Sequence, residues 1–171
     1  MEKECPQLNL NLAWEPVGDA SGAIVTFPLK RDCKISQQAY GKPVVYRWKV
    51  RKPSETEPYR VYIGETDSLF RRIRNYRSAH PSQKQTYRIA CQLREEAAKG
   101  AIVELEVLSF PIFFVNGEMI EPSALSDPDR RKLMENLALV LQDRVNCEVS
   151  NISLKRFDRR IRQAEKTELA K

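Results

Sequence analysis

Residues 61–77, with the sequence VYIGETDSLFRRIRNYR, constrain the fold of this chain more than any other segment. The run Val61, Tyr62 and Ile63 has β-branched and aromatic side chains, which favour a strand. Gly64 then permits the close backbone approach or unusual dihedral angles that a strand-to-helix turn needs. The segment therefore predicts a strand that breaks at a glycine and is followed at once by a helix.

The predicted helix is basic and has several candidate caps. Thr66, Asp67 or Ser68 can cap it, and its apolar residues lie on one side while arginines lie elsewhere around it. The apolar residues are Leu69, Phe70 and Ile73, and the arginines are Arg71, Arg72 and Arg74. A helix N-terminus carries partial positive charge, and arginine offers a planar fork of donors to phosphate oxygens. On these residues alone, an anion site and an ordinary turn with a solvated basic face both stay open.

Composition bounds the class of protein. With 171 residues, 42% hydrophobic and 30% charged, the chain fits one globular domain with a substantial core. No apolar run approaches the roughly 20 residues of a membrane span, and residues 1–7 do not resemble a secretory signal. The net charge of +6 permits an acidic partner such as nucleic acid. Four scattered cysteines without a CxxC pair, and a single histidine, argue against structural zinc and favour a cytoplasmic protein with reduced thiols.

The remaining segments predict an α/β domain with a small, mainly antiparallel, three-stranded central sheet flanked by helices and preceded by an N-terminal β-hairpin. Strands are predicted at 44–50, 59–64 and 101–110, and helices at 83–100 and from 128 onward. In that last helix Ser126 or Asp127 is the cap. Its expected buried face is Leu133, Leu137, Val140 and Leu141. Residues 111–126 could form a hairpin arm or an insertion. The expected division is a 1–42 extension, a 43–153 domain and a basic 154–171 helix.

Over residues 43–153 the order of motifs resembles the GIY-YIG nuclease family. Val44-Val45-Tyr46 stands where that family has its first tripeptide, and Tyr62-Ile63-Gly64 is an unaltered second one. Arg72 follows ten residues after Tyr62, and Tyr76 four residues later. Glu135, in a predicted helix, and Asn151, after it, are similar to the family's metal-binding glutamate and later asparagine. Asn146 competes with Asn151, and Glu118 or Glu121 competes with Glu135.

The resemblance implies an active site built from Tyr46, Tyr62, Arg72, Tyr76, Glu135 and Asn151. Arg72 would hold the scissile phosphate, and Glu135 would ligate one divalent cation, magnesium or manganese. Tyr46 would be a general base or a base-assisting phenol, with the other tyrosines positioning water or phosphate. A phenol that titrates near 10 is a poor base at neutral pH unless neighbouring charges lower its pKa.

Basic residues around this block suggest DNA contacts. The candidates are Arg71, Arg74, Arg77, His80, Lys84 and Arg88. The terminal basic segment is either a further contact or a solvated helix. The predicted function is metal-dependent DNA cleavage, most simply by a restriction-type enzyme that cuts both strands as a homodimer or by sequential nicking. The alternatives are a structure-specific repair or recombination nuclease and a non-catalytic nucleic-acid-binding module.

Overall fold

The computed structural model describes residues 8–115, 118–120, 123–143 and 148–149. Its centre is an antiparallel sheet of four strands in the spatial order β1 (Leu8–Pro16), β4 (Ile102–Val115), β2 (Val44–Arg51) and β3 (Arg60–Thr66). Two short strands extend it: β5 (Glu118–Ile120) pairs with β4, and β6 (Glu148–Val149) runs parallel to β3. The three predicted strands are confirmed as β2, β3 and β4, but the sheet is larger than expected.

The N-terminal region differs from the predicted hairpin. A tight turn does join Val17 to Val25, whose backbone nitrogen donates to the Val17 carbonyl at 2.8 Å. However, the first arm is β1, and it pairs along β4 instead of with the second arm. The second arm forms only isolated bridges, one of them between Thr26 and Glu104. β4 offers a long free edge, so the N-terminal strand becomes part of the central sheet.

In the described part of the chain four helices accompany the sheet: α1 (Gln37–Tyr40), α2 (Leu69–Arg77), α3 (Lys84–Ala98) and α4 (Pro128–Asp143), with a 3₁₀ turn η1 (Ser123–Ser126) before α4. Two predicted caps are confirmed. The Ser68 hydroxyl accepts a hydrogen bond from the backbone nitrogen of Arg71, and the Asp127 carboxylate accepts one from that of Asp129 at 2.9 Å. Within the described residues, no helix combines the length and apolarity needed to cross a bilayer.

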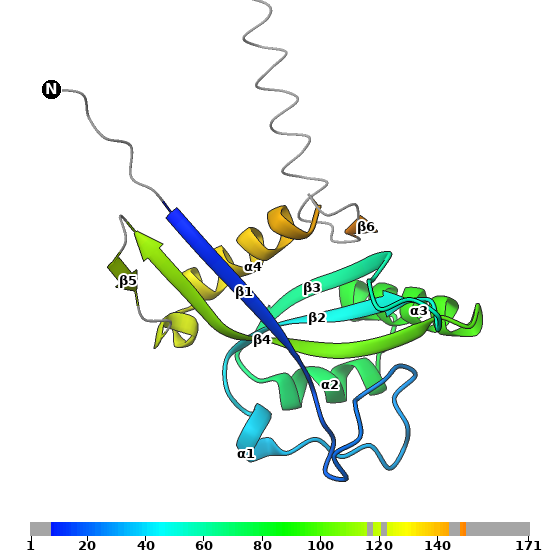
Figure 1. The fold of residues 1–171 in the computed structure, drawn as a ribbon. Coiled ribbons are helices and arrows are strands. Elements are labelled where there is room, and N and C mark those ends of the chain that lie inside the picture. The colour runs from blue at the N-terminus through cyan, green and yellow to red at the C-terminus, as the bar shows by residue number, and fades with distance from the viewer. Residues whose placement is uncertain (1–7, 116–117, 121–122, 144–147, 150–171) are drawn as a thin grey trace, which may run out of the picture.

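Helices α2 and α4 lie on opposite sides of the sheet (Figure 1), and its two faces carry different cores. Tyr46, Trp48 and Tyr62 belong to a cluster that includes residues of α2 and α3. Val45 and Ile63 point to the other face, where they pack with α4. The alternation of side chains along a strand therefore separates an α2/α3 face from an α4 face.

The orientation of α4 corrects the expected apolar face. Leu133, Val140 and Leu141 are 54%, 38% and 40% exposed, and only Leu137 packs partly against the core. The buried side instead consists of Arg131, Met134, Glu135, Ala138 and Leu139. The apolar pattern on this side is interrupted by an arginine and a glutamate one turn apart. Periodicity therefore favoured the wrong stripe.

Candidate active site

The glycine of the Tyr62-Ile63-Gly64 motif makes room for a tyrosine on the neighbouring strand. Tyr46 lies directly opposite Gly64 in the β2–β3 ladder. A β-carbon built on Gly64 would lie 2.8 Å from the Tyr46 hydroxyl oxygen and 2.9 Å from its ring. Because real β-carbons do not approach other atoms so closely, any larger residue at 64 would displace the Tyr46 ring.

Tyr46 and Tyr76 form a buried pair of phenols. Their hydroxyl oxygens are 3.2 Å apart and hydrogen-bonded, and the two side chains are 4% and 3% exposed. Trp48 packs edge-on against Tyr76, with ring centroids 5.7 Å apart. The spacing of Tyr76 on α2 and the position of Tyr46 on β2 thus fix both hydroxyls at one place.

Burial controls the chemistry of these phenols. It raises the pKa of Tyr46 well above its ordinary value of 10.0, and the neighbouring Tyr76 raises it further, while Arg72 opposes the shift. Burial also raises the pKa of Tyr76, again against Arg72. Both phenols are therefore neutral near pH 7 in this structure. They can donate and accept hydrogen bonds, but Tyr46 is not poised to act alone as a base.

Arg72 approaches this pair from α2. Its side chain is half-buried, and its Nε atom is enclosed without a hydrogen-bond partner among the described residues. Within the described part of the chain Arg72 forms no ion pair, although its charge acts on Tyr46, Tyr76 and Glu135. A partly enclosed guanidinium without a carboxylate partner is suited to bind an anion.

Glu135 approaches from α4, on the other side of the sheet. Its side chain is buried and pairs with the Lys132 ammonium group. Burial raises the pKa of Glu135 above its ordinary value of 4.5, Lys132 opposes this, and Glu65 raises the pKa further. The negative charge of the Glu135 carboxylate is therefore only partly compensated by Lys132, and a bound cation would favour the ionised form of this carboxylate.

Glu65 and Arg131 support this carboxylate, and the sequence analysis did not identify them. Arg131 Nε donates to Glu65 Oε2 at 2.5 Å, and Arg131 Nη1 donates to the Leu125 carbonyl at 2.8 Å. The ion pair ties α4 to the end of β3, one turn before Glu135 on the same side of the helix. The only sequence signal was the arginine and glutamate four residues apart, which also occurs on solvated helices.

The donor set fits one type of metal site. Among the described residues, no group of three or more His, Cys, Asp or Glu side chains is arranged to hold a metal ion. Mg²⁺ keeps several waters and is commonly bound by one or two carboxylates together with substrate phosphates. Glu135, with Glu65 acting on it electrostatically, fits such an open site and not an all-protein cage.

The remaining candidates for the active site have different positions. Tyr62 is buried on the same face as Tyr46, opposite Trp48 in the ladder, and it contributes to the raised pKa of Tyr59. Glu118 begins β5, which pairs with β4. Asn151, its competitor Asn146, and Glu121 lie outside the described residues.

The candidates for DNA contact also differ in their positions, exposure and partners. Arg71 is exposed and paired with Asp67, and His80 lies in the loop after α2 with Nδ1 3.1 Å from the Ser82 hydroxyl. Lys84 is exposed at the start of α3. Arg88, further along α3, is half-buried, and no described residue forms a hydrogen bond with its enclosed Nε and Nη2 atoms. The other two candidates, Arg74 and Arg77, line a pocket beside α2. The basic terminal segment lies outside the described residues.

Three comparisons with known proteins found no match, whether to family models, to curated proteins or to solved structures. The resemblance to the GIY-YIG nucleases therefore rests on the motifs and their spacing. The structure adds the arrangement of four side chains, Tyr46, Tyr76, Arg72 and Glu135. The proposed function rests on the chemistry of these side chains.

Proposed function

We propose that this protein is a metal-dependent endonuclease that hydrolyses DNA phosphodiester bonds, most simply a restriction-type cutter of double-stranded DNA. One observation carries the proposal. Arg72 from α2 and Glu135 from α4 interact electrostatically, although these helices cover opposite faces of the sheet, and both act on the Tyr46 phenol. A cation-binding carboxylate, an anion-binding guanidinium and neutral hydroxyls are thereby combined.

Arg72 would bind the non-bridging oxygens of the scissile phosphate. A guanidinium aimed at the charge that develops on phosphorus stabilises the transition state more than the ground state. Arg72 suits this role because its charge is not compensated by a described carboxylate, and because it is partly enclosed, where screening by water is reduced.

The two phenols would position the attacking water. In a neutral hydrogen-bonded pair one hydroxyl donates to the other, so an acceptor or donor position is left over for water or for a phosphate oxygen. The raised pKa values of Tyr46 and Tyr76 assign them to orientation. Deprotonation of the water would then need another acceptor, such as a substrate phosphate oxygen.

Glu135 would hold a divalent cation, Mg²⁺ or Mn²⁺. When bound, such an ion neutralises charge on the phosphate and stabilises the leaving oxygen. The chain's own part is to keep the Glu135 carboxylate buried and oriented by α4, which the Arg131–Glu65 pair ties to β3. Lys132, which is about half exposed, balances part of the Glu135 charge.

Cutting both strands would be served by two copies of the chain. We assign the contact between copies to the exposed stripe Leu133, Val140 and Leu141 on the outer side of α4, because a two-fold dimer would place this apolar stripe of one copy against that of the other. Sedimentation equilibrium tests this assignment. A dimer that dissociates when Leu141 is replaced by glutamate supports it, and a wild-type monomer at all concentrations contradicts it.

A plasmid-cleavage assay tests the function. Purified protein should linearise supercoiled DNA with magnesium or manganese, and Arg72→Ala and Glu135→Ala should abolish cleavage. Run-off sequencing of the ends would define the cut. Preference for flaps or junctions over duplex would assign the protein to structure-specific repair nucleases. Metal-independent binding without cutting would make it a non-catalytic module and contradict the proposal.

A further inference from the structure

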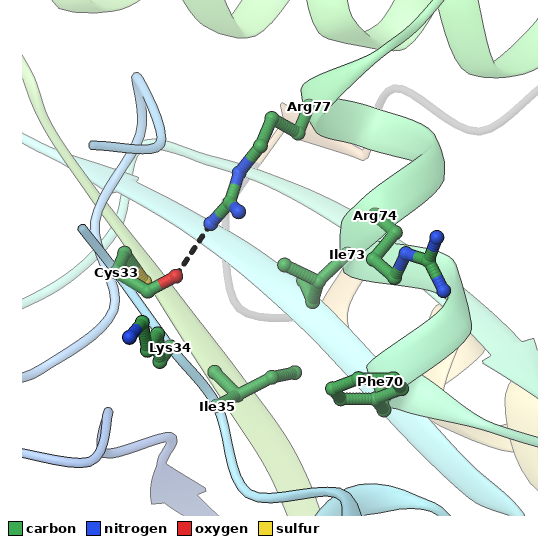
Figure 2. Close-up of a pocket in the computed structure, with 7 residues that line it drawn as sticks. All are labelled: Cys33, Lys34, Ile35, Phe70, Ile73, Arg74 and Arg77. Carbon is green, nitrogen blue, oxygen red and sulfur yellow. Dashed lines mark hydrogen bonds between the residues drawn. The ribbon is translucent and has the colours of Figure 1, made fainter. Parts of the chain in front are cut away.

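A pocket of about 340 Å³ lies between α2 and the segment that precedes α1 (Figure 2). It is lined by Cys33, Lys34, Ile35, Phe70, Ile73, Arg74 and Arg77. This volume is at the lower end of the range of small-molecule sites, about 300–1,000 Å³. The pocket is therefore large enough for one planar ring system with a short polar extension.

The interior of the pocket is apolar and includes one aromatic ring. Ile35, Phe70 and Ile73 point toward the same hollow from two different segments of the chain (Figure 2). Ile73 is 2% exposed and Ile35 8% exposed, so the floor is part of the core. Phe70 packs at the margin of that core and leaves its ring at the wall of the pocket. An apolar floor with a ring at the wall favours a flat, weakly polar ligand group.

The rim of the pocket is positively charged. Lys34 lies on one side of it and Arg74 and Arg77 lie on the α2 side (Figure 2), and no aspartate or glutamate among the described residues lines the pocket. Arg77 Nη2 donates to the Cys33 carbonyl at 2.5 Å, which fixes one side of the rim. Within the described part of the chain Arg74 has no ion-pair partner. An apolar protein side chain in the pocket would leave these cations uncompensated, whereas a ligand with a base and a phosphate would match both the floor and the rim.

The pocket is separate from the candidate active site, although both use α2. With 3.6 residues per turn, Phe70, Arg74 and Arg77 project from one side of the helix, and Arg72 projects from the other. Leu69 and Tyr76 lie between them, buried against the sheet. A nucleic-acid strand that crosses the exposed surface of α2 would pass Arg72 first and the pocket next.

We propose that this pocket binds one unpaired nucleotide of a DNA strand, with the base against Phe70, Ile35 and Ile73 and the phosphate held by Arg74. The identity of the ligand as DNA rests on the proposed function. The base must be unpaired because a pocket of this size does not admit a base pair. Stacking on an aromatic side chain is largely independent of base identity, so the site adds affinity for single-stranded or locally opened DNA without reading a sequence.

The test measures binding in the absence of cleavage. Fluorescence anisotropy would follow a labelled single-stranded oligonucleotide, titrated with Glu135→Gln protein without metal. Adding Phe70→Leu or Arg74→Gln should weaken binding about tenfold, as expected for loss of one stacked base or one phosphate contact. Adding Arg130→Gln, which removes the same charge from an exposed position on α4 outside the pocket, should change binding no more than about twofold. Phe70→Tyr keeps the ring and should retain affinity, which separates loss of stacking from misfolding.

The outcomes distinguish this inference from the proposed function. Equal losses for Arg74→Gln and Arg130→Gln, or full affinity for Phe70→Leu, would show only general electrostatic attraction and would overturn the proposed nucleotide site. If wild-type protein cuts plasmid DNA while the pocket variants bind normally, the inference fails alone. If the pocket variants weaken binding but wild-type protein never cuts DNA, the nucleotide site stands and the nuclease proposal fails.

Discussion

The two faces of the central sheet differ in how they treat polar groups. On the α2/α3 face, Tyr46 and Tyr76 bury neutral hydroxyls that satisfy each other. On the α4 face, Glu135 and Arg131 are buried as charges and are compensated by ion pairs. The α2/α3 face therefore offers a neutral pair of hydroxyls beside the Arg72 guanidinium, and the α4 face offers a buried carboxylate held in place by its partners. A hydrolytic site for phosphodiesters needs both.

The two faces meet electrostatically at the C-terminal half of β3. β6 pairs only with Arg60 and Val61, so among the described residues the rest of β3 has β2 as its single neighbour. Arg72 and Glu135 influence each other there from opposite faces. We therefore expect substitutions on the α2/α3 face to affect catalysis by displacing side chains. Substitutions on the α4 face should also affect the stability of the protein, because they change how the buried charges are compensated.

The largest effect is expected for Arg72→Ala. Removing the guanidinium should lower kcat for plasmid cleavage by about 10²–10³-fold, as for other donors aimed at transition-state charge. Arg71→Ala is the matched control, because Arg71 lies on the same helix but is exposed and paired with Asp67. If both variants lost the same activity, α2 would contribute only general DNA affinity, and the special role of Arg72 would be wrong.

The second largest effect is expected at Gly64, which makes room for the Tyr46 ring on the neighbouring strand. Gly64→Ala should destabilise the protein by about 1–3 kcal/mol, because the added methyl group meets the buried Tyr46 ring. Urea unfolding would measure this loss, and cleavage should fall at the same time. Gly18→Ala is the control, since a β-carbon there meets no atom within 4 Å. Equal stability of the two variants would contradict the assigned role of the motif glycine.

Glu135→Gln tests the charge on the α4 face. The pKa of Glu135 is raised in the folded protein, so the native state binds this proton more tightly than the unfolded chain does. The contribution of Glu135 to stability is therefore full below its ordinary pKa of 4.5 and is lost as pH rises through the folded pKa. Glutamine does not titrate and lacks this loss. Without metal, Glu135→Gln should unfold at a higher temperature than wild type near pH 7, and the difference should vanish toward pH 4.5.

Addition of magnesium should reduce that difference, because a bound cation stabilises the ionised glutamate but not the amide. A glutamine variant less stable than wild type at neutral pH would show that the Lys132 pair outweighs the cost of burying Glu135. Thermal unfolding at several pH values, with and without magnesium, therefore distinguishes a strained carboxylate from a purely structural ion pair.

The sequence was sufficient where local chemistry decides the structure. β-branched and aromatic runs located β2, β3 and β4, and short polar side chains located the caps at Ser68 and Asp127. The resemblance to the nuclease family grouped Tyr46 with Tyr76, and the structure shows their hydroxyls hydrogen-bonded. The sequence failed where the decision depends on distant partners: β1 pairs with β4 across most of the chain, and nothing local specifies that pairing.

The candidate site shows the same limit. Arg131 and Glu65 are residue types that are common on solvated surfaces, and the burial of Arg131 is explained by its contacts with Glu65 and with the Leu125 carbonyl. The same burial explains why the prediction for α4 was wrong. A hydrophobic pattern identifies the buried face of a helix by its apolar residues, and the buried face of α4 includes an arginine and a glutamate. The resemblance to a nuclease family suggested Glu135, but the residues that hold it in place required the structure.

The smallest effect is expected on the outer side of α4. Leu133→Ala should change the free energy of unfolding by no more than about 0.5 kcal/mol, because Leu133 is 54% exposed. Leu139→Ala, on the inner side, should cost about 2–5 kcal/mol, because Leu139 is 1% exposed and its removal leaves a cavity. Unfolding by urea at low protein concentration would avoid any contribution from association between copies. A large loss for Leu133→Ala under those conditions would mean that its side of α4 is covered within one chain, and the proposed contact between copies would have to be placed elsewhere.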